Sequence, residues 1–336
     1  MRRYLGIAAA LVLVAVSVGG STATSVAADY ELRVGSYAPE GDVIDQTLQR
    51  FKEEVETKSD GRVEVTVFRN NTLGSNREVL EMAKIGGVDF LVAGASHVSN
   101  FAPVLGAVAF PFLWTDRDTL LEVLDGELGD QLIASAEAQA DGLKLLAWWE
   151  TGFRHVSNNR QPIMKPEDLK GLKIRTLPTP VQVAFWKAMG AIPTPMGWAE
   201  VMPALQQGVI DGQENPPAVV YPYKVYEFQK YYSLTGHSNE PTLFVASKAN
   251  FEALPEDVQQ IVLDAIAVVT PFERQIADDY NRDIMGELSK VIEINEVPEE
   301  TLVTFREVAA SIYEASYADV GDDGKAFVEA VIEKTH

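Results

Sequence analysis

The first part of the chain shows two hydrophobic patterns, one typical of strands and one typical of a helix. Apolar and polar residues alternate in "ELRVGSYA" (31–38) and again in "RVEVTVF" (62–68), which predicts two strands. Between them, the spacing of apolar residues over 42–58 predicts an amphipathic helix. Four apolar side chains share one face of this helix: Ile44, Leu48, Phe51 and Val55.

A second helix and a third strand follow in the sequence. Ser75 and Glu78, three residues apart, form a capping box that predicts the start of a helix, which we expect to extend to about Ile85. The apolar run "VDFLVAG" (88–94) then predicts a buried strand. This strand–helix–strand–helix–strand order predicts a parallel, doubly wound sheet.

A second series of alternating elements begins near Leu143. The predicted strands cover residues 143–149, 154–158, 173–176, 191–196 and 209–215. The predicted helices cover residues 165–171, 180–189 and 198–207, with another starting at the prolines 216 and 217. Long helices are expected over about 256–292 and 299–317, followed by a short one at the end.

This order predicts an α/β protein with two lobes, crossed by more than one connection and clasped by a long helix. Residues 29–150 would form mainly the first lobe and residues 151–240 mainly the second. Residues 241–336 would supply a crossover strand, the long helix and C-terminal helices that pack on both lobes.

The first 28 residues have the pattern of a secretory signal peptide. Arg2 and Arg3 precede the apolar run "LGIAAALVLVAVSV", and the small residues of "SVAA" lie before Asp29. The alternative is a retained anchor helix, but the apolar run is shorter than the roughly 20 residues that span a bilayer. We therefore expect a periplasmic protein, exported and cleaved near Ala28.

The charge of the chain narrows the range of partners. The formal net charge is −21 and there is no cysteine, so neither a disulfide nor a lipid-attachment site is expected. Strong acidity argues against nucleic acid and anionic membrane surfaces. It leaves small anionic ligands open, because salt screens distant charges over about 8 Å. One stretch, residues 144–175, holds more basic than acidic side chains.

Motifs for metal binding, nucleotide binding and hydrolysis are missing. The histidines lack metal-ligand spacing, and "DVGDDG" (319–324) fails as a calcium loop because Gly321 and Ala330 stand at ligand positions. No G-x-S-x-G, Walker-type or G-x-G-x-x-G motif occurs, and thiol catalysis is excluded. We expect no enzyme activity, no cofactor and no metal.

Three polar residues at predicted strand ends suggest a ligand site. Arg175 ends the strand before the helix at Pro180, and ligands of open α/β sheets bind at the carboxyl ends of strands. Its planar guanidinium matches a carboxylate bidentately, unless it forms a structural ion pair with Asp or Glu. Asn215 could bind a polar group or simply cap a helix. Arg154, which we expect to end another strand, is either a second cation or a surface arginine.

Three segments carry a resemblance to a known family. They resemble the extracytoplasmic solute-binding proteins of TRAP transporters, the DctP-type family, and the resemblance extends over about 30–317. The segments are "GLKIRTLPTP" (171–180), "AMGAIPTPMGWAEVMPALQQGVIDGQENP" (188–216) and "GFRHVSNNRQPI" (152–163). The resemblance implies a periplasmic-binding-protein-like fold whose two lobes close over an organic acid. It also implies that Arg175 pairs with the ligand carboxylate, with Arg154 and Asn215 as further contacts.

The resemblance adds further candidate side chains around the ligand. Trp198, after "TPM", would pack on the ligand, unless it is an ordinary core tryptophan. Tyr37 and the run ending at His97 differ from sialic-acid-binding members, which argues against sialic acid. Glu240 could accept hydroxyls of a sugar acid or an amine of a zwitterion, or be a solvated loop residue. Asn76 completes the candidate substrate-binding set.

The resemblance also implies the partners. We expect a monomer that delivers a small carboxylate-bearing ligand to a membrane permease, with transport driven by an ion gradient and without ATP. A receptor for a sensor kinase would have the same fold and site. An exported enzyme acting on an organic acid is a further alternative, as is an ABC-type sugar receptor, for which three tryptophans could act as platforms: Trp148, Trp149 and Trp198.

Overall fold

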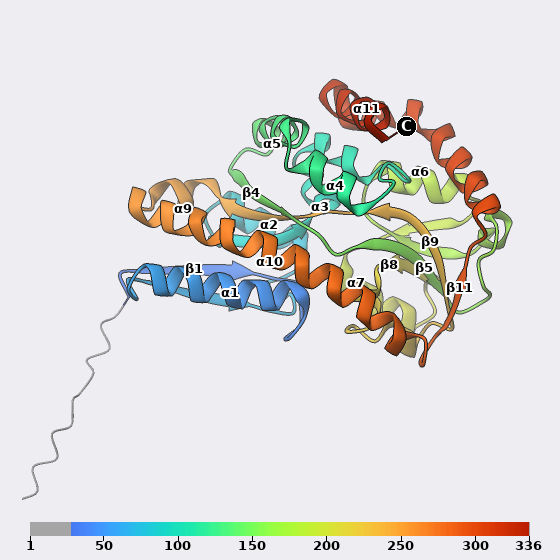
Figure 1. Ribbon diagram of the computed structural model, residues 1–336, viewed down its shortest axis with the longest axis horizontal. Coiled ribbons are helices and arrows are strands. Elements are labelled where there is room, and N and C mark those ends of the chain that lie inside the picture. Colours follow the sequence, from blue (N-terminus) through green and yellow to red (C-terminus); the bar gives the residue numbers. More distant parts are fainter. Residues whose placement is uncertain (1–27, 336) are drawn as a thin grey trace, which may run out of the picture.

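Two β-sheets, each covered by helices, form the two lobes of the molecule (Figure 1). The structure is a computed structural model and describes residues 28–335, so the predicted leader up to residue 27 lies outside the described residues. The first sheet has the strand order β2-β1-β3-β10-β4. Its strands are β1 (Tyr30–Gly35), β2 (Val63–Phe68), β3 (Phe90–Gly94), β4 (Leu143–Trp149) and β10 (Thr242–Ser247).

The first sheet is mixed and not wholly parallel as expected. Strands β2, β1 and β3 are parallel, which the alternating order predicted. Strand β10 lies between β3 and β4 and is antiparallel to both, because it returns from the second lobe. The helices α1 (Val43–Lys58) and α2 (Asn76–Lys84) form where their patterns predicted, and α2 begins with the predicted capping box of Ser75.

The segment between β3 and β4 contains helices that the patterns did not reveal. They are α3 (Ala95–Val98), the 3₁₀ helix η1 (Pro103–Ala109), α4 (Arg117–Leu124) and α5 (Glu127–Gln139). Residues 104–109 are all buried, so no polar face marks the turns of η1. The aromatic ring of Phe110 then packs on Tyr313 and Tyr317 of the C-terminal helix.

The second sheet has six strands in the order β11-β9-β5-β8-β6-β7. Four of its strands were predicted and are confirmed: β5 (Phe153–Asn158), β6 (Lys173–Thr176), β7 (Ile192–Pro195) and β8 (Gly212–Asn215). Two strands were not predicted: β9 (Tyr231–Asn239) and β11 (Glu293–Glu296). The helices between the strands are η2 (Pro166–Leu169), α6 (Pro180–Ala188), α7 (Trp198–Gln206), α8 (Pro217–Val220) and η3 (Val225–Glu227).

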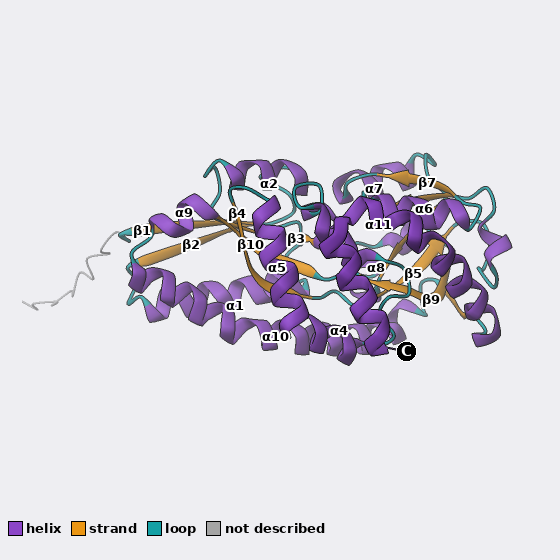
Figure 2. Cartoon of the chain, turned by 90° about the horizontal axis from the view of Figure 1, so that it is seen from above, coloured by secondary structure: helices purple, strands orange, loops and turns teal. Residues whose placement is uncertain are grey.

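Long helices connect the lobes. After α9 (Lys248–Ala253), helix α10 (Glu256–Leu288) contacts α1 and β4 of the first lobe and α8 of the second, and it runs along both in Figure 1. Helix α11 (Glu299–Thr335) is interrupted at Gly321, as the prediction of a separate short last helix requires. In Figure 2, β1 and β2 lie toward one end and β7 and β9 toward the other. No helix within 28–335 combines the length and apolarity needed to cross a bilayer.

Candidate functional site

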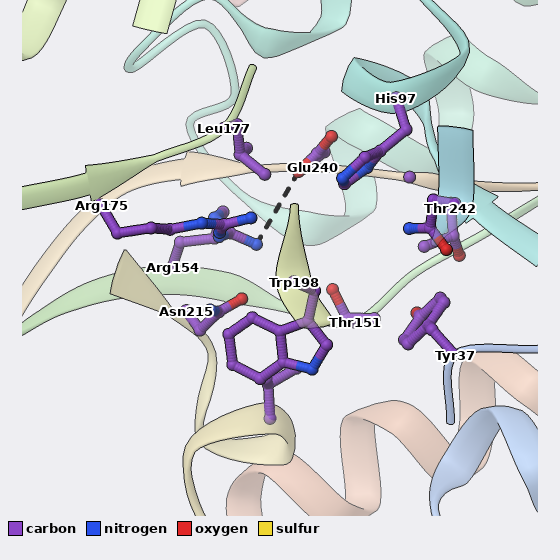
Figure 3. A pocket seen from close by; sticks show the side chains of 13 residues that line it. Tyr37, His97, Thr151, Arg154, Arg175, Leu177, Trp198, Asn215, Glu240 and Thr242 are labelled. Carbon is purple, nitrogen blue, oxygen red and sulfur yellow. Dashed lines mark ion pairs between the residues drawn. The ribbon is translucent and has the colours of Figure 1, made fainter. Parts of the chain in front are cut away.

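One cavity brings together every candidate site residue of the sequence analysis (Figure 3). Those lining side chains are Tyr37, Asn76, His97, Arg154, Arg175, Trp198, Asn215 and Glu240. The remaining lining residues are Gly94, Thr151, Leu177, Val219 and Thr242. The sequence analysis missed Thr151, Leu177 and Thr242. Each lies two or three residues from a recognised site residue at a strand end, and that spacing is the signal that could have found it.

Sheet topology explains why the arginines and Asn215 meet at one edge. Strands β6 and β8 are parallel, so their carboxyl ends, which carry Arg175 and Asn215, lie at the same edge. Arg154 does not end a strand as expected, because it is the second residue of β5. Since β5 is antiparallel to β8, with His155 opposite Asn215, the start of β5 also lies at this edge.

Arg175 is a buried cation without a carboxylate partner. The side chain is 1% exposed, and its Nε and Nη2 donate to the Met196 carbonyl at 3.1 and 2.9 Å. The guanidinium lies 5.7 Å from the ring centroid of Trp198. Within residues 28–335, Arg175 forms no ion pair. The structural salt bridge considered as an alternative is therefore not present in these residues. Burial lowers the pKa of Arg175 to about 10, which leaves the group charged at neutral pH.

Arg154, in contrast, forms a bidentate ion pair within the protein. Its Nε donates to Glu214 Oε2 at 2.5 Å, and its Nη2 donates to Glu214 Oε1 at 2.9 Å and to the Glu214 carbonyl at 2.6 Å. An oxygen of a second carboxylate, Oε2 of Glu240, lies 3.8 Å from Arg154 Nη1. The alternative of a surface strand arginine is wrong, because Arg154 is 4% exposed.

A layer behind Arg154 fixes the charge of Glu214. The ring Nε2 of His237 lies 3.3 Å from Glu214 Oε2, and its Nδ1 lies 2.8 Å from Thr235 Oγ1. Burial alone would raise the pKa of Glu214, but Arg154 and the hydrogen bond with His237 lower it to about 2. Glu214 is therefore ionised at neutral pH and neutralises Arg154.

Glu240 is held at the centre of the cavity and is not a solvated loop residue. It is 4% exposed, and its Oε1 accepts the Ser96 N–H at 2.8 Å. Burial raises the pKa of its carboxyl group, against the lowering effects of Arg154 and Ser96. Figure 3 shows Glu240 between the two guanidiniums and His97.

The side of the cavity away from the guanidiniums is polar and uncharged (Figure 3). Both ring nitrogens of His97 and the Thr242 hydroxyl are buried without a hydrogen-bond partner in the described residues. Burial, reinforced by the charges of Arg175 and Arg154, lowers the pKa of His97 to about 3, so the ring is neutral. Buried polar atoms normally have partners, so these orphaned atoms point to a polar ligand.

The remaining candidates line the cavity from both lobes. Asn215 does not cap the next helix, because Pro216 is the N-cap and the Asn215 amide donates to Gln213. Trp198 begins α7 and packs edge to face on Tyr223, with ring centroids 5.0 Å apart. The hydroxyl of Tyr223 donates to the Tyr37 carbonyl at 3.1 Å and so connects the lobes.

Three further points concern Asn76, metal binding and the acidic run 319–324. Asn76 is the first residue of α2 and lines the cavity from the first lobe. No group of three or more His, Cys, Asp or Glu side chains within residues 28–335 is arranged to hold a metal ion. The acidic run 319–324 contains Gly321, at which α11 is interrupted.

Comparisons with known proteins agree with this geometry. A family model described as bacterial extracellular solute-binding protein, family 7, matches residues 34–319. The 2,3-diketo-L-gulonate-binding periplasmic protein YiaO of Escherichia coli is 35% identical over 272 residues, covering 81% of this chain and 82% of that protein.

Two solved structures extend the similarity to the fold. The sugar acid binding protein DctPAm from Advenella mimigardefordensis, in complex with galactonate, has a TM-score of 0.87 at 29% identity, covering 91% of this chain and 98% of that one. A TRAP periplasmic solute binding protein from Sulfurospirillum deleyianum with bound succinate has a TM-score of 0.86 at 31% identity, covering 90% and 99%.

Proposed function

The chain belongs to family 7 of the bacterial extracellular solute-binding proteins, and we propose that it captures a small organic acid whose carboxylate pairs with Arg175. The observation that carries this proposal is a buried guanidinium at the cavity that forms no ion pair within the described residues. A carboxylate matches the guanidinium fork bidentately, and the pair gains strength when water is excluded. Solved structures of similar proteins hold succinate and galactonate.

The two-lobed architecture supports capture by closure. Tyr37, Asn76 and His97 line the cavity from the first lobe, whereas Arg175 and Asn215 line it from the second. A ligand that contacts both sets favours the closed arrangement over the open one, because only the closed arrangement makes both sets of contacts. The closed form would be what a membrane permease recognises.

The name of a relative indicates the compartment in which the protein binds its ligand. The Escherichia coli relative is named a periplasmic protein, and the chain begins with the pattern of a signal peptide. We propose that the mature protein is periplasmic, acts as a monomer and delivers its ligand to the permease of a TRAP transporter.

A thermal melt of the protein without its leader tests the proposal. Organic acids, sugar acids, zwitterions and neutral sugars would each be added, starting with succinate, galactonate and galactitol. A ligand at 100 times its Kd adds about 2.7 kcal/mol of stability, which raises the Tm measurably. We expect shifts from carboxylates only. Shifts from neutral sugars alone, or from no acid in the panel, would contradict the proposal.

A further inference from the structure

We propose that the cavity selects hydroxylated monocarboxylates over dicarboxylates, and that Glu240 sets this preference. The inference rests on the carboxylate pairing proposed for Arg175. It concerns how the cavity recognises the part of the ligand that does not pair with Arg175.

The cavity has one cation free for a ligand. Among the described residues that line it, only Arg154 and Arg175 are cationic, since the ring of His97 is neutral. Glu214 occupies Arg154 with a two-pronged ion pair. Arg175 can therefore compensate one carboxylate, and a second carboxylate finds no unpaired cation.

Glu240 makes a second carboxylate unfavourable. Its Oε1 is fixed by the Ser96 N–H, and a Cβ at Gly94 would lie 3.1 Å from this oxygen, so the backbone of β3 approaches it closely. Its Oε2 lies 3.8 Å from Arg154 Nη1, which is beyond hydrogen-bond distance. A ligand that extends from Arg175 across the cavity would bring a second carboxyl group toward Glu240, and two neighbouring carboxylates cannot both be ionised without a cost in free energy.

The orphaned polar atoms favour hydroxyl groups. A neutral imidazole has one donor and one acceptor, and the threonine hydroxyl can act as either. Hydroxyls can satisfy both kinds of atom on His97 and Thr242, whereas a carboxylate only accepts and an ammonium group only donates.

Isothermal titration with matched ligand pairs tests the selectivity. D-Erythronate and meso-tartrate differ only in a terminal CH₂OH or carboxylate, as do D-galactonate and galactarate. We expect the monocarboxylate of at least one pair to bind at least tenfold more tightly than its dicarboxylate. Equal or tighter dicarboxylate binding would overturn this inference but leave the proposed function intact. Failure of every acid to bind would instead overturn the proposed function.

The substitution Glu240→Gln tests the assigned residue. Glutamine keeps the volume and an acceptor for the Ser96 N–H, so the main change is loss of the charge. We expect the affinity ratio within the preferred pair to fall at least tenfold. Glu137→Gln is the matched control, because Glu137 also accepts a backbone N–H, from Leu145 at 2.7 Å, but does not line the cavity. An unchanged ratio in a folded Glu240→Gln protein would overturn the assignment.

Discussion

Arg154 and Arg175 lie at the same edge of one sheet and are both buried, yet the protein compensates only one of them. Arg154 is held by Glu214 through three hydrogen bonds, and Glu214 is held in turn by His237. Arg175 has a single carbonyl, that of Met196, and the face of Trp198. We propose that the difference separates two uses of a guanidinium: Arg154 stabilises the sheet edge, and Arg175 binds the carboxylate of a ligand.

The largest expected effect is loss of stability when the pair at Arg154 is broken. Glu214→Gln would remove the bidentate partner of a buried guanidinium and leave only the Glu240 carboxylate at 3.8 Å, which should cost about 3–5 kcal/mol of unfolding free energy. Urea denaturation measures the change. Glu81→Gln is the control, because its ion pair with Arg77 is exposed and should contribute about 0.5 kcal/mol or less. Equal losses of unfolding free energy in Glu214→Gln and Glu81→Gln would contradict the stabilising role assigned to the Arg154–Glu214 pair.

Arg175 should show the opposite balance between stability and binding. Arg175→Ala removes a guanidinium that forms no ion pair with a described residue, so the unfolding free energy should stay within about 1 kcal/mol of wild type. Ligand affinity should fall by about 2–5 kcal/mol, because a desolvated charged partner is lost. Calorimetric titration with the best acid of the panel measures this. Arg175→Lys should also bind weakly, since a point charge cannot replace the fork. Wild-type affinity in Arg175→Ala would refute the site assignment.

Acid titration should distinguish the Arg154 pair from ordinary surface pairs. The pKa of Glu214 is lowered to about 2 in the folded protein, below its ordinary value of 4.5. The stabilisation from its ionised form is therefore complete above about pH 4.5 and is lost as the pH falls toward 2. The stability difference between wild type and Glu214→Gln should be constant from pH 7 to 5 and then shrink by up to about 1.4 kcal/mol per pH unit. A difference that already shrinks between pH 7 and 5 would show that another group controls it.

The smallest effect is expected at the aromatic neighbour of Arg175. Trp198→Leu removes the ring face below the guanidinium, an interaction of about 0.5–2 kcal/mol. The affinity for the organic acid should fall by this amount in Trp198→Leu. It should fall by less in Trp198→Phe, which keeps a ring face. Trp186→Phe, at a core tryptophan that does not line the cavity, should leave affinity unchanged. Equal affinities for Trp198→Leu and wild type would exclude Trp198 from the site.

The sequence predicted the positions of Arg175 and Asn215 because strand ends are local features. Pro178 and Pro216 follow β6 and β8 closely and mark where these strands end, and parallel strands align those ends. The pairing of Arg154 could not be predicted in this way, since Glu214 is 60 residues away and meets it only through antiparallel pairing of β5 with β8.

Other features could not be predicted because they depend on distant parts of the chain or lack a local pattern. Strand β10 reads as one more apolar strand, and only the return of the chain from the second lobe makes it antiparallel to β3 and β4. The burial of Glu240 depends on that same crossing, so its sequence neighbours could not reveal it. Helix η1 is buried on all sides and therefore shows no helical periodicity.

The most direct test of the central claim is a crystal structure of the protein with the tightest-binding acid of the panel. The account predicts that both oxygens of the ligand carboxylate accept hydrogen bonds from the Arg175 guanidinium, at roughly 2.7–2.9 Å, while the Arg154–Glu214 pair stays intact. A carboxylate that displaces Glu214 from Arg154, or that binds at the His97 side with Arg175 uncontacted, would contradict it.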